Sequence, residues 1–333
     1  MDEYIRQIQN YIVQMIPDEY EVSITENLKN NGVLLHGICI KAPGDVIAPI
    51  IYAENYYNNG FTAQEAAQGI INKYYEEKEK EADKFDLSNI KDFSKISEHI
   101  CYKVIGQEHN KDLLNNIPWN EVCGNLALCY YIDLCKEENG SATITITNRF
   151  MDIWGIDKST LHAYAEINTP IRHPLKFRSM NETLLELVMK EGHLYEMKYQ
   201  YGMETLTDLE FIQKMTEEMD MSNTVPMYVL STMDQRYGAT AILYDNVIDG
   251  IKNQLGTNYW VIPSSLYEMI IIPYSEEMTP QELRDMVMQV NESEVKLQDQ
   301  LSNSVYFSDG QDLFLIDGDE IPSQLLEYQE EER

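Results

Sequence analysis

Two serines and a glutamate stand close together where one apolar run of the chain ends and the next begins. They are Ser264, Ser265 and Glu268, and the flanking runs are 258–262 and 267–272. A serine beside a carboxylate could act as a nucleophile, but it also needs a base within hydrogen-bonding distance and donors for an oxyanion. No G-x-S-x-G elbow surrounds these serines. They are therefore catalytic candidates or, more simply, a Pro-Ser-Ser turn whose hydroxyls bind the local backbone.

One compact basic cluster stands out in the chain. Its side chains that could bind an anionic ligand are Arg172, His173, Lys176 and Arg178. Guanidinium groups hold phosphate or carboxylate through paired hydrogen bonds, so the cluster could be a ligand site. Surface cations more often pair with carboxylates of their own protein, and the cluster is also consistent with internal ion pairs.

The other histidines and the cysteines lack the spacing of metal ligands. The histidines are isolated from one another, without an H-E-x-x-H pattern: His36, His99, His109, His162 and His193. The cysteines are odd in number, without a C-x-x-C pattern: Cys39, Cys101, Cys123, Cys129 and Cys135. The sequence therefore predicts free thiols and no metal site. It also lacks a Walker loop and a G-x-G-x-x-G pattern, so we expect no cofactor bound through those devices.

The chain is strongly acidic. It carries 25 Lys and Arg against 56 Asp and Glu, a formal net charge of −31. Such a field repels nucleic-acid phosphates and anionic membranes, and it attracts basic surfaces. Because the acidic residues are spread along the chain, the charge suits solubility; a surface that mimics nucleic acid is the alternative.

The N-terminus and the hydropathy indicate where the protein resides. The chain opens Met1-Asp2-Glu3, which has the wrong charge for the start of a signal peptide, and no apolar run reaches the length of a membrane span. We expect a cytoplasmic protein that does not enter a membrane.

The elements that must position the candidate residues begin with an N-terminal αβββα unit over 1–83. Isoleucines at helical spacing predict a helix over Glu3–Ile16. Alternating apolar residues predict a hairpin over Tyr20–Ile40 and a third strand over Val46–Ala53. A capping box at Thr62–Glu65 opens the second helix.

A polar stretch, 84–95, predicts a linker, and 96–222 predicts a mainly helical middle region. Strands are expected at Ile100–Ile105 and Thr143–Thr147, and Asn125–Leu134 fits a helix or a strand. The expected helices are His109–Asn115, Asp157–Ile167, Glu182–Met189 and Asp208–Met219.

The C-terminal unit, 223–316, has the pattern ββαββα followed by a hairpin, and an acidic tail, 317–333, ends the chain. Its first four strands are expected at Met227–Thr232, Ala239–Tyr244, Asn258–Ile262 and Tyr267–Ile272. A helix, Asn246–Leu255, is expected between the second and the third strand. The next helix has a capping box with proline at its first position, Thr279–Glu282. The sequence thus predicts an α+β protein with antiparallel or mixed sheets and helices packed on one face.

Short patterns spread over nearly the whole chain carry a resemblance to a known family. They are Ala48-Pro49, Ile51-Tyr52, Tyr56-Tyr57, Gly60, Lys103, Asn110, Leu113-Leu114, Pro118, Trp154-Gly155-Ile156, Ala165, Asn168-Thr169-Pro170, Met227–Leu230, Gly238-Ala239, Ile262–Ser265, Glu268, Leu301–Asn303 and Val305-Tyr306. In this order they resemble DUF5688, a family of unknown function found in bacteria, mostly gut Clostridia. Members often have His-Glu after the Ser-Ser turn, whereas this chain has Tyr267-Glu268. The resemblance implies neither an activity nor a cofactor.

These observations favour binding over catalysis. We expect an acidic adaptor or regulator that contacts another protein, one with a basic surface. The alternatives are a hydrolase-like enzyme whose motif has diverged and an acidic nucleic-acid mimic. Direct binding to nucleic acid or to a membrane is disfavoured by the charge.

Overall fold

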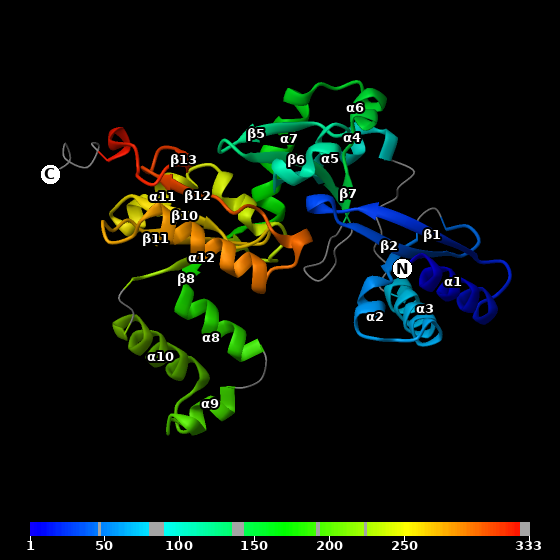
Figure 1. Ribbon diagram of the computed structural model, residues 1–333, viewed down its shortest axis with the longest axis horizontal. Coiled ribbons are helices and arrows are strands. Elements are labelled where there is room, and N and C mark those ends of the chain that lie inside the picture. Colours follow the sequence, from blue (N-terminus) through cyan, green and yellow to red (C-terminus); the bar gives the residue numbers. More distant parts are fainter. Residues whose placement is uncertain (46–47, 80–89, 135–142, 191–193, 223–224, 327–333) are drawn as a thin grey trace. The chain divides into compact units, whose positions relative to one another are not determined.

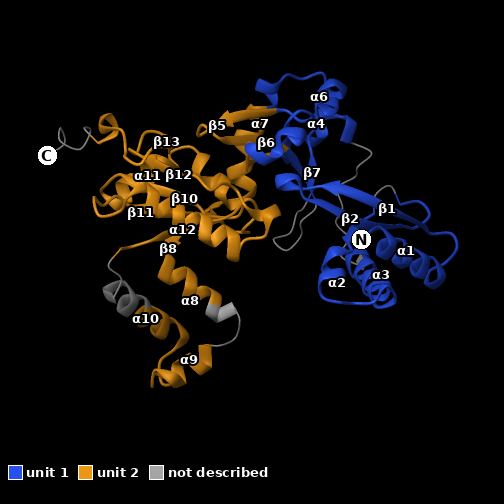
Figure 2. Ribbon diagram, in the orientation of Figure 1, with its two compact units in different colours: residues 1–100, 108–118, 131–161 blue, residues 101–107, 119–130, 162–333 orange. Residues whose placement is uncertain are grey.

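Figure 1 shows the computed structural model of the chain. The structure describes residues 1–45, 48–79, 90–134, 143–190, 194–222 and 225–326. Parts of the predicted linker 84–95 and of the acidic tail 317–333 lie outside these residues, as do Cys135 and His193. The chain forms two compact units (Figure 2). Unit 1 comprises 1–100, 108–118 and 131–161, and unit 2 comprises 101–107, 119–130 and 162–333.

The first part of unit 1 is the αβββα arrangement that the sequence predicts, with one additional short helix. Its elements are α1 (Asp2–Met15), β1 (Glu21–Leu28), β2 (Leu34–Lys41), β3 (Ile50–Tyr52), α2 (Glu54–Asn58) and α3 (Ala63–Glu79). The strands form an antiparallel sheet in the order β1-β2-β3. The predicted hairpin is confirmed, and the described part of the third strand is shorter than Val46–Ala53.

The core of this region joins both long helices to the sheet. Ile8 and Ile12 of α1, Ile38 of β2 and Ile70 of α3 are fully buried in one apolar cluster. The predicted capping box is present: the Thr62 backbone N–H and hydroxyl bond to the Glu65 carboxylate at 2.8 and 2.7 Å. The helical period of α1 and the alternation of β2 therefore bring their apolar faces together.

Residues 96–222 contribute to both units and contain strands as well as helices. The strands here are β4 (Ile100–Gly106), β5 (Trp119–Val122), β6 (Leu126–Asp133), β7 (Thr143–Thr145) and β8 (Leu175–Ser179). In unit 2, β4, β6 and β5 are neighbours in that order. All eight residues of β6 are buried, so the ambiguous segment Asn125–Leu134 is a strand. In unit 1, the end of β6 pairs with β7.

The helices of this stretch follow the sequence pattern only in part. They are α4 (Phe93–Ile96), α5 (Lys111–Leu114), α6 (Asn148–Trp154), α7 (Lys158–Arg172), α8 (Met180–Lys190), α9 (Leu194–Gln200) and α10 (Asp208–Ser222). Helix α7 continues through Pro170, past its predicted end. The proline removes only its own N–H from the helix, and the His173 N–H still donates to Thr169 O at 2.8 Å.

Unit 2 is centred on a six-stranded sheet. Its later elements are β9 (Tyr228–Thr232), α11 (Val247–Leu255), β10 (Tyr259–Pro263), β11 (Met269–Pro273), α12 (Pro280–Ser293), β12 (Val305–Ser308) and β13 (Leu313–Ile316). The strand order is β13-β12-β10-β11-β9-β8, and all five pairings are antiparallel. The α+β fold class predicted from the sequence is confirmed.

Helix α12 packs on one face of this sheet. Leu283 and Val287 contact the cluster that contains Trp260 and Phe307. The Thr279 hydroxyl accepts from the Glu282 N–H, and the Glu282 carboxylate bonds back to Thr279, so the predicted capping box is present.

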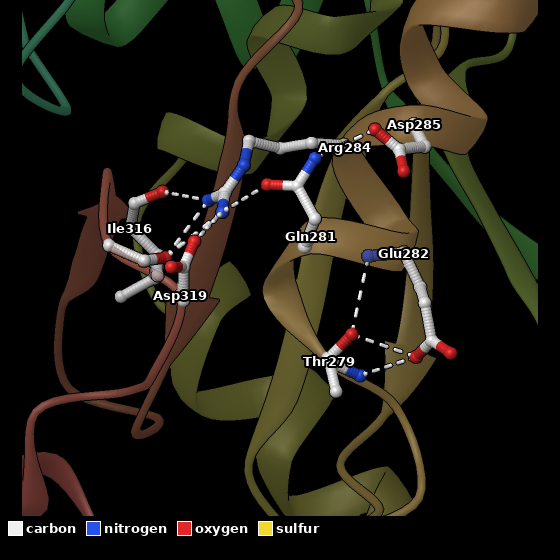
Figure 3. A network of polar contacts seen from close by, with 8 residues as sticks. Thr279, Gln281, Glu282, Arg284, Asp285, Ile316 and Asp319 are labelled. Carbon is white, nitrogen blue, oxygen red and sulfur yellow. Dashed lines mark hydrogen bonds and ion pairs between the residues drawn. The ribbon is translucent and has the colours of Figure 1, made fainter.

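Arg284 ties α12 to the end of β13 (Figure 3). Its guanidinium donates to Ile316 O at 3.0 Å and to Gly318 O at 3.1 Å. It also contacts Gln281 and Asp319 at 3.1 and 3.4 Å. The planar fork of arginine suits this set of acceptors, so the side chain fixes the helix to the strand end.

One predicted strand is wrong. Residues Ala239–Tyr244 alternate as a strand would, but Gly238–Leu243 is a 3-10 helix. Strand β9 already pairs with β8 on one edge and β11 on the other, so no edge is free for a further strand next to it. The small side chains of this segment instead allow it to lie close to the sheet, where the Thr240 hydroxyl accepts from the Val104 N–H at 3.1 Å.

No helix in the described ranges is both long and apolar enough to cross a bilayer.

Candidate functional site

Two groups of candidate residues that are far apart in the sequence meet on the six-stranded sheet. Lys176 of β8 lies opposite Ser231 of β9, and Leu230 lies opposite Met269 of β11. Glu268 precedes Met269, so it continues the row that runs through Ser231 and Lys176. Residues opposite one another on neighbouring strands project from the same face. We name this group, with the loop residues Asp234 and Tyr237, the β9 site.

Glu268 is a carboxyl of the β9 site whose pKa is raised. Its side chain is half-buried, and burial raises the pKa of Glu268, while the positive charge of Lys176 opposes the shift. Lys176 is also hydrogen-bonded to Glu186 at 2.5 Å. The lysine thus interacts with two carboxylates, Glu186 through a hydrogen bond and Glu268 through its charge.

The serines of the turn between β10 and β11 are bonded locally. The backbone N–H groups of Ser264 and Ser265 donate to Glu268 O at 3.1 and 3.2 Å. The Ser265 hydroxyl accepts from the Tyr267 N–H at 3.1 Å. Among the described residues, neither hydroxyl bonds to a carboxylate or an imidazole. The geometry is that of a turn stabilised by a serine, and it lacks an activated nucleophile.

The basic cluster is held by carboxylates of the same chain. Lys176 and Arg178 both contact Glu186, at 2.5 and 3.3 Å. His173 contacts Asp234 at 2.8 Å. Arg172 ends α7. Internal ion pairs are thus present within the basic cluster.

The His173–Asp234 pair is buried. His173 is 2% exposed, its Nδ1 lies 2.8 Å from Asp234 Oδ2, and its carbonyl accepts from the Tyr244 hydroxyl at 3.0 Å. Burial alone would raise the pKa of Asp234, but the hydrogen bond and charge of His173 and the Arg236 N–H hold it at about 2. The carboxylate is therefore charged at neutral pH and anchors the loop after β9 to the end of α7.

That loop has an unusual backbone. Gln235 and Tyr237 have φ of 57° and 46°, in the left-handed region that non-glycine residues rarely adopt. The Gln235 N–H donates to Thr232 O at 3.0 Å, and the Thr232 hydroxyl donates to Arg236 O at 3.3 Å. Strained residues of this kind concentrate at functional sites, which makes the loop part of the candidate site. No sequence signal marks it, because glutamine and tyrosine do not favour this conformation.

Two tyrosines complete the surroundings of the site. The Lys103 ammonium lies 4.3 Å from the centre of the Tyr237 ring and 3.3 Å from its hydroxyl. The Tyr267 hydroxyl donates to Asp299 at 2.8 Å. Burial, followed by the Asp299 contact, raises the pKa of Tyr267 well above its ordinary value. The Tyr267 phenol is therefore a neutral hydrogen-bonding group at physiological pH.

Metal and redox chemistry have no visible centre in the described ranges. No group of three or more His, Cys, Asp or Glu side chains there could hold a metal ion. Four cysteines in these ranges carry no disulfide: Cys39, Cys101, Cys123 and Cys129. Burial raises the pKa of Cys129 to about 12 and that of Cys123 to about 11, so these thiols remain protonated and unreactive.

The fold defines an α+β protein with open antiparallel sheets, and its candidate site consists of carboxylates, tyrosines and paired lysines. The chain belongs to the family of unknown function DUF5688, whose model matches residues 1–309. Among curated proteins and solved structures, none shows significant similarity to the chain.

Proposed function

We propose that this protein is a non-catalytic adaptor or regulator that binds another protein through an acidic surface. Several of the polar groups that suggested catalysis or ligand binding are used within the fold. The Ser265 hydroxyl holds a turn, His173 is buried against Asp234, and Lys176 is paired with Glu186. Groups bound in this way are poorly placed to attack a substrate.

The observation that carries the proposal is the exposure of large apolar side chains on the helices of unit 2. The exposed residues on α9 and the start of α10 are Tyr195, Tyr199 and Leu209. Exposed aromatic and aliphatic side chains are typical of protein interfaces. With a net charge of −31, the partner that this protein attracts is basic.

Affinity purification of the tagged chain from its native host tests the proposal. We expect a defined protein partner at about 50 mM salt that is largely lost at about 300 mM, because exposed charges are screened over a shorter distance as salt rises. A duplex DNA competitor separates the alternatives, since a nucleic-acid mimic competes with DNA for its partner and an adaptor does not. Recovery of no partner at either salt concentration contradicts the proposal.

A second function rests on one specific observation, the raised pKa of Glu268 beside Lys176. A carboxyl tuned upward in this way can act as a general acid or base. The test is turnover of generic ester and phosphate substrates by the wild-type protein and by Glu268→Gln and Ser264→Ala. Turnover that disappears in either variant while the fold is retained would establish an enzyme and contradict the binding proposal.

A further inference from the structure

Helix α9 and the start of α10 form a corner held by one lysine. Lys198, which is 7% exposed, donates to Leu206 O at 2.7 Å and to Asp208 at 2.6 Å. The backbone of Lys198 also accepts from the Met203 N–H at 2.8 Å. We call residues 194–210 the α9–α10 corner. Because its turn is fixed from within, its outer side chains are presented in a defined arrangement.

The corner exposes four large side chains. Tyr195 and Tyr199 are 74% and 70% exposed, Leu209 is 76% exposed and Tyr201 is 48% exposed. Tyr195 and Tyr199 are four residues apart on α9, so they lie on the same face of the helix. The inner face of the corner is used differently, since Leu194 and Met197 pack against the core of Leu185, Phe211 and Met215. The exposed side chains are thus the face that the fold leaves uncovered.

The α9–α10 corner is also rich in carboxylates. The corner carries four exposed acidic residues, Glu196, Glu204, Asp208 and Glu210. Its one basic residue, Lys198, is buried and already paired. The Glu210 carboxylate bonds to Thr207, and this hydrogen bond lowers the pKa of Glu210, so it is charged at neutral pH. The surface therefore combines tyrosine rings with more acidic than basic side chains.

We propose that the α9–α10 corner is the docking surface for a basic amphipathic helix of a partner protein. The inference rests on the proposed binding function and assigns it to a place. Tyrosines supply a large contact area at low entropic cost, and the carboxylates of the corner can pair with Lys and Arg of a partner. Apolar side chains on one face of a helix, with lysines beside them, match both features. A second copy of this chain and a nucleic acid are both disfavoured, because each is strongly negative.

A synthetic helical peptide of leucine and lysine, about 14 residues or four turns long, tests the inference. Its fluorescence anisotropy reports binding to the full chain at low salt. A second peptide, with serine in place of leucine, has the same charge and no apolar face. We expect the leucine peptide to bind at least about tenfold more tightly than the serine peptide, because only it can cover the tyrosines.

The decisive variants are the double substitution Tyr195→Ser with Tyr199→Ser and a matched control, Ile167→Ser with Ile171→Ser on α7. The control residues are 65% and 72% exposed, which matches the tyrosines. We expect the tyrosine variant to weaken leucine-peptide binding about tenfold or more and the control to change it less than about twofold. Circular dichroism confirms that each variant is folded.

Two outcomes overturn the inference. If the leucine peptide binds the wild type and both variants equally, the corner is not the docking surface, although binding itself remains possible at another place. If the leucine peptide does not bind the wild type, a basic amphipathic helix is the wrong occupant. Partner capture from the native host is a separate measurement, so failure of the proposed function and failure of this assignment are told apart.

Discussion

His173 Nδ1 lies 2.8 Å from Asp234 Oδ2, so a partly buried hydrogen bond joins the end of α7 to the loop that follows β9. The loop contains both left-handed non-glycine residues described above, Gln235 and Tyr237. The strain of the loop is therefore balanced by a charged contact on one side and by the hydroxyl of Thr232 on the other.

The Asp234 carboxylate should make stability depend on acid. Its pKa is lowered to about 2 from the ordinary 3.8, so its contribution is complete above pH 4 and is lost as the pH falls through 2. The shift corresponds to about 2 kcal/mol. We expect Asp234→Asn to lower the free energy of unfolding by about that amount at pH 7 and to flatten its decline between pH 4 and 2 relative to the wild type. Urea denaturation at several pH values measures this, and identical pH profiles would contradict it.

Gly238 should tolerate no side chain. A Cβ at this position would lie 2.2 Å from Tyr267 O and 2.8 Å from Thr232 N, both of them backbone atoms. We expect Gly238→Ala to lower the free energy of unfolding by about 2 kcal/mol or more. The control is Gly250→Ala within α11, where nothing lies within 4 Å of the new Cβ. That change should stabilise the protein by about 0.5–1 kcal/mol, because alanine favours helix. Equal effects of the two substitutions on the melting temperature would show that the close approach is not real.

The charged carboxylate of Glu268 should lower the free energy of unfolding at neutral pH. Burial raises its pKa, so its contribution to stability is present below the unfolded pKa and is lost as the pH rises through the folded one. We expect Glu268→Gln to raise the melting temperature at pH 7 and to have a smaller effect near pH 4, where the carboxyl takes up a proton. If Glu268→Gln instead lowers the melting temperature, and does so more at pH 7 than at pH 4, the attraction of Glu268 to Lys176 outweighs the effect of burial.

Arg284 should control the order of the strand end that it holds. Arg284→Lys retains the charge but loses the planar fork that reaches Ile316 O and Gly318 O. We expect a loss of about 1–3 kcal/mol in the free energy of unfolding and faster amide hydrogen exchange around β13. Hydrogen exchange measured by mass spectrometry detects this, with β1 of unit 1 as the internal reference. Unchanged exchange at β13 would show that the contacts do not hold the strand.

The reactivity of the thiols should differ sharply between the folded and the unfolded protein. Burial raises the pKa of Cys129 to about 12, so it should react slowly with a disulfide reagent in buffer. In denaturant, all five cysteines of the sequence should react. Titration with such a reagent counts them, and elemental analysis should find no stoichiometric zinc. Fewer than five thiols in denaturant, or one zinc ion per chain, would contradict this prediction.

Short-range sequence patterns predicted correctly those elements whose structure depends mainly on neighbouring residues. The isoleucines of α1, the alternation of β1 and β2 and the capping box of α12 each follow from short-range spacing. The strand predicted at Ala239–Tyr244 failed for a non-local reason, because both edges of β9 are already paired. No pattern within that segment contains this information.

The candidate site was the least accessible part to sequence analysis. Lys176 and Glu268 were both noted in the sequence, but they approach one another only because β8 and β11 flank β9, and strand order is not written in either segment. Part of the basic cluster lies in the edge strand β8, and its charged residues interrupt the apolar alternation by which a strand is recognised in a sequence. The left-handed conformations of Gln235 and Tyr237 have no signature, since tertiary contacts impose them.

The alternation of the two units along the chain has a consequence for biosynthesis. Unit 1 is completed only when residue 161 has left the ribosome, yet 101–107 and 119–130 of unit 2 emerge before that point. These two stretches include the apolar strand β4 and most of the fully buried β6, whose remaining partners in unit 2 are translated later. Exposed apolar strands on a nascent chain invite aggregation. Translation speed and chaperone access over this interval should therefore affect the yield of folded protein more than they do for a chain whose domains follow one another.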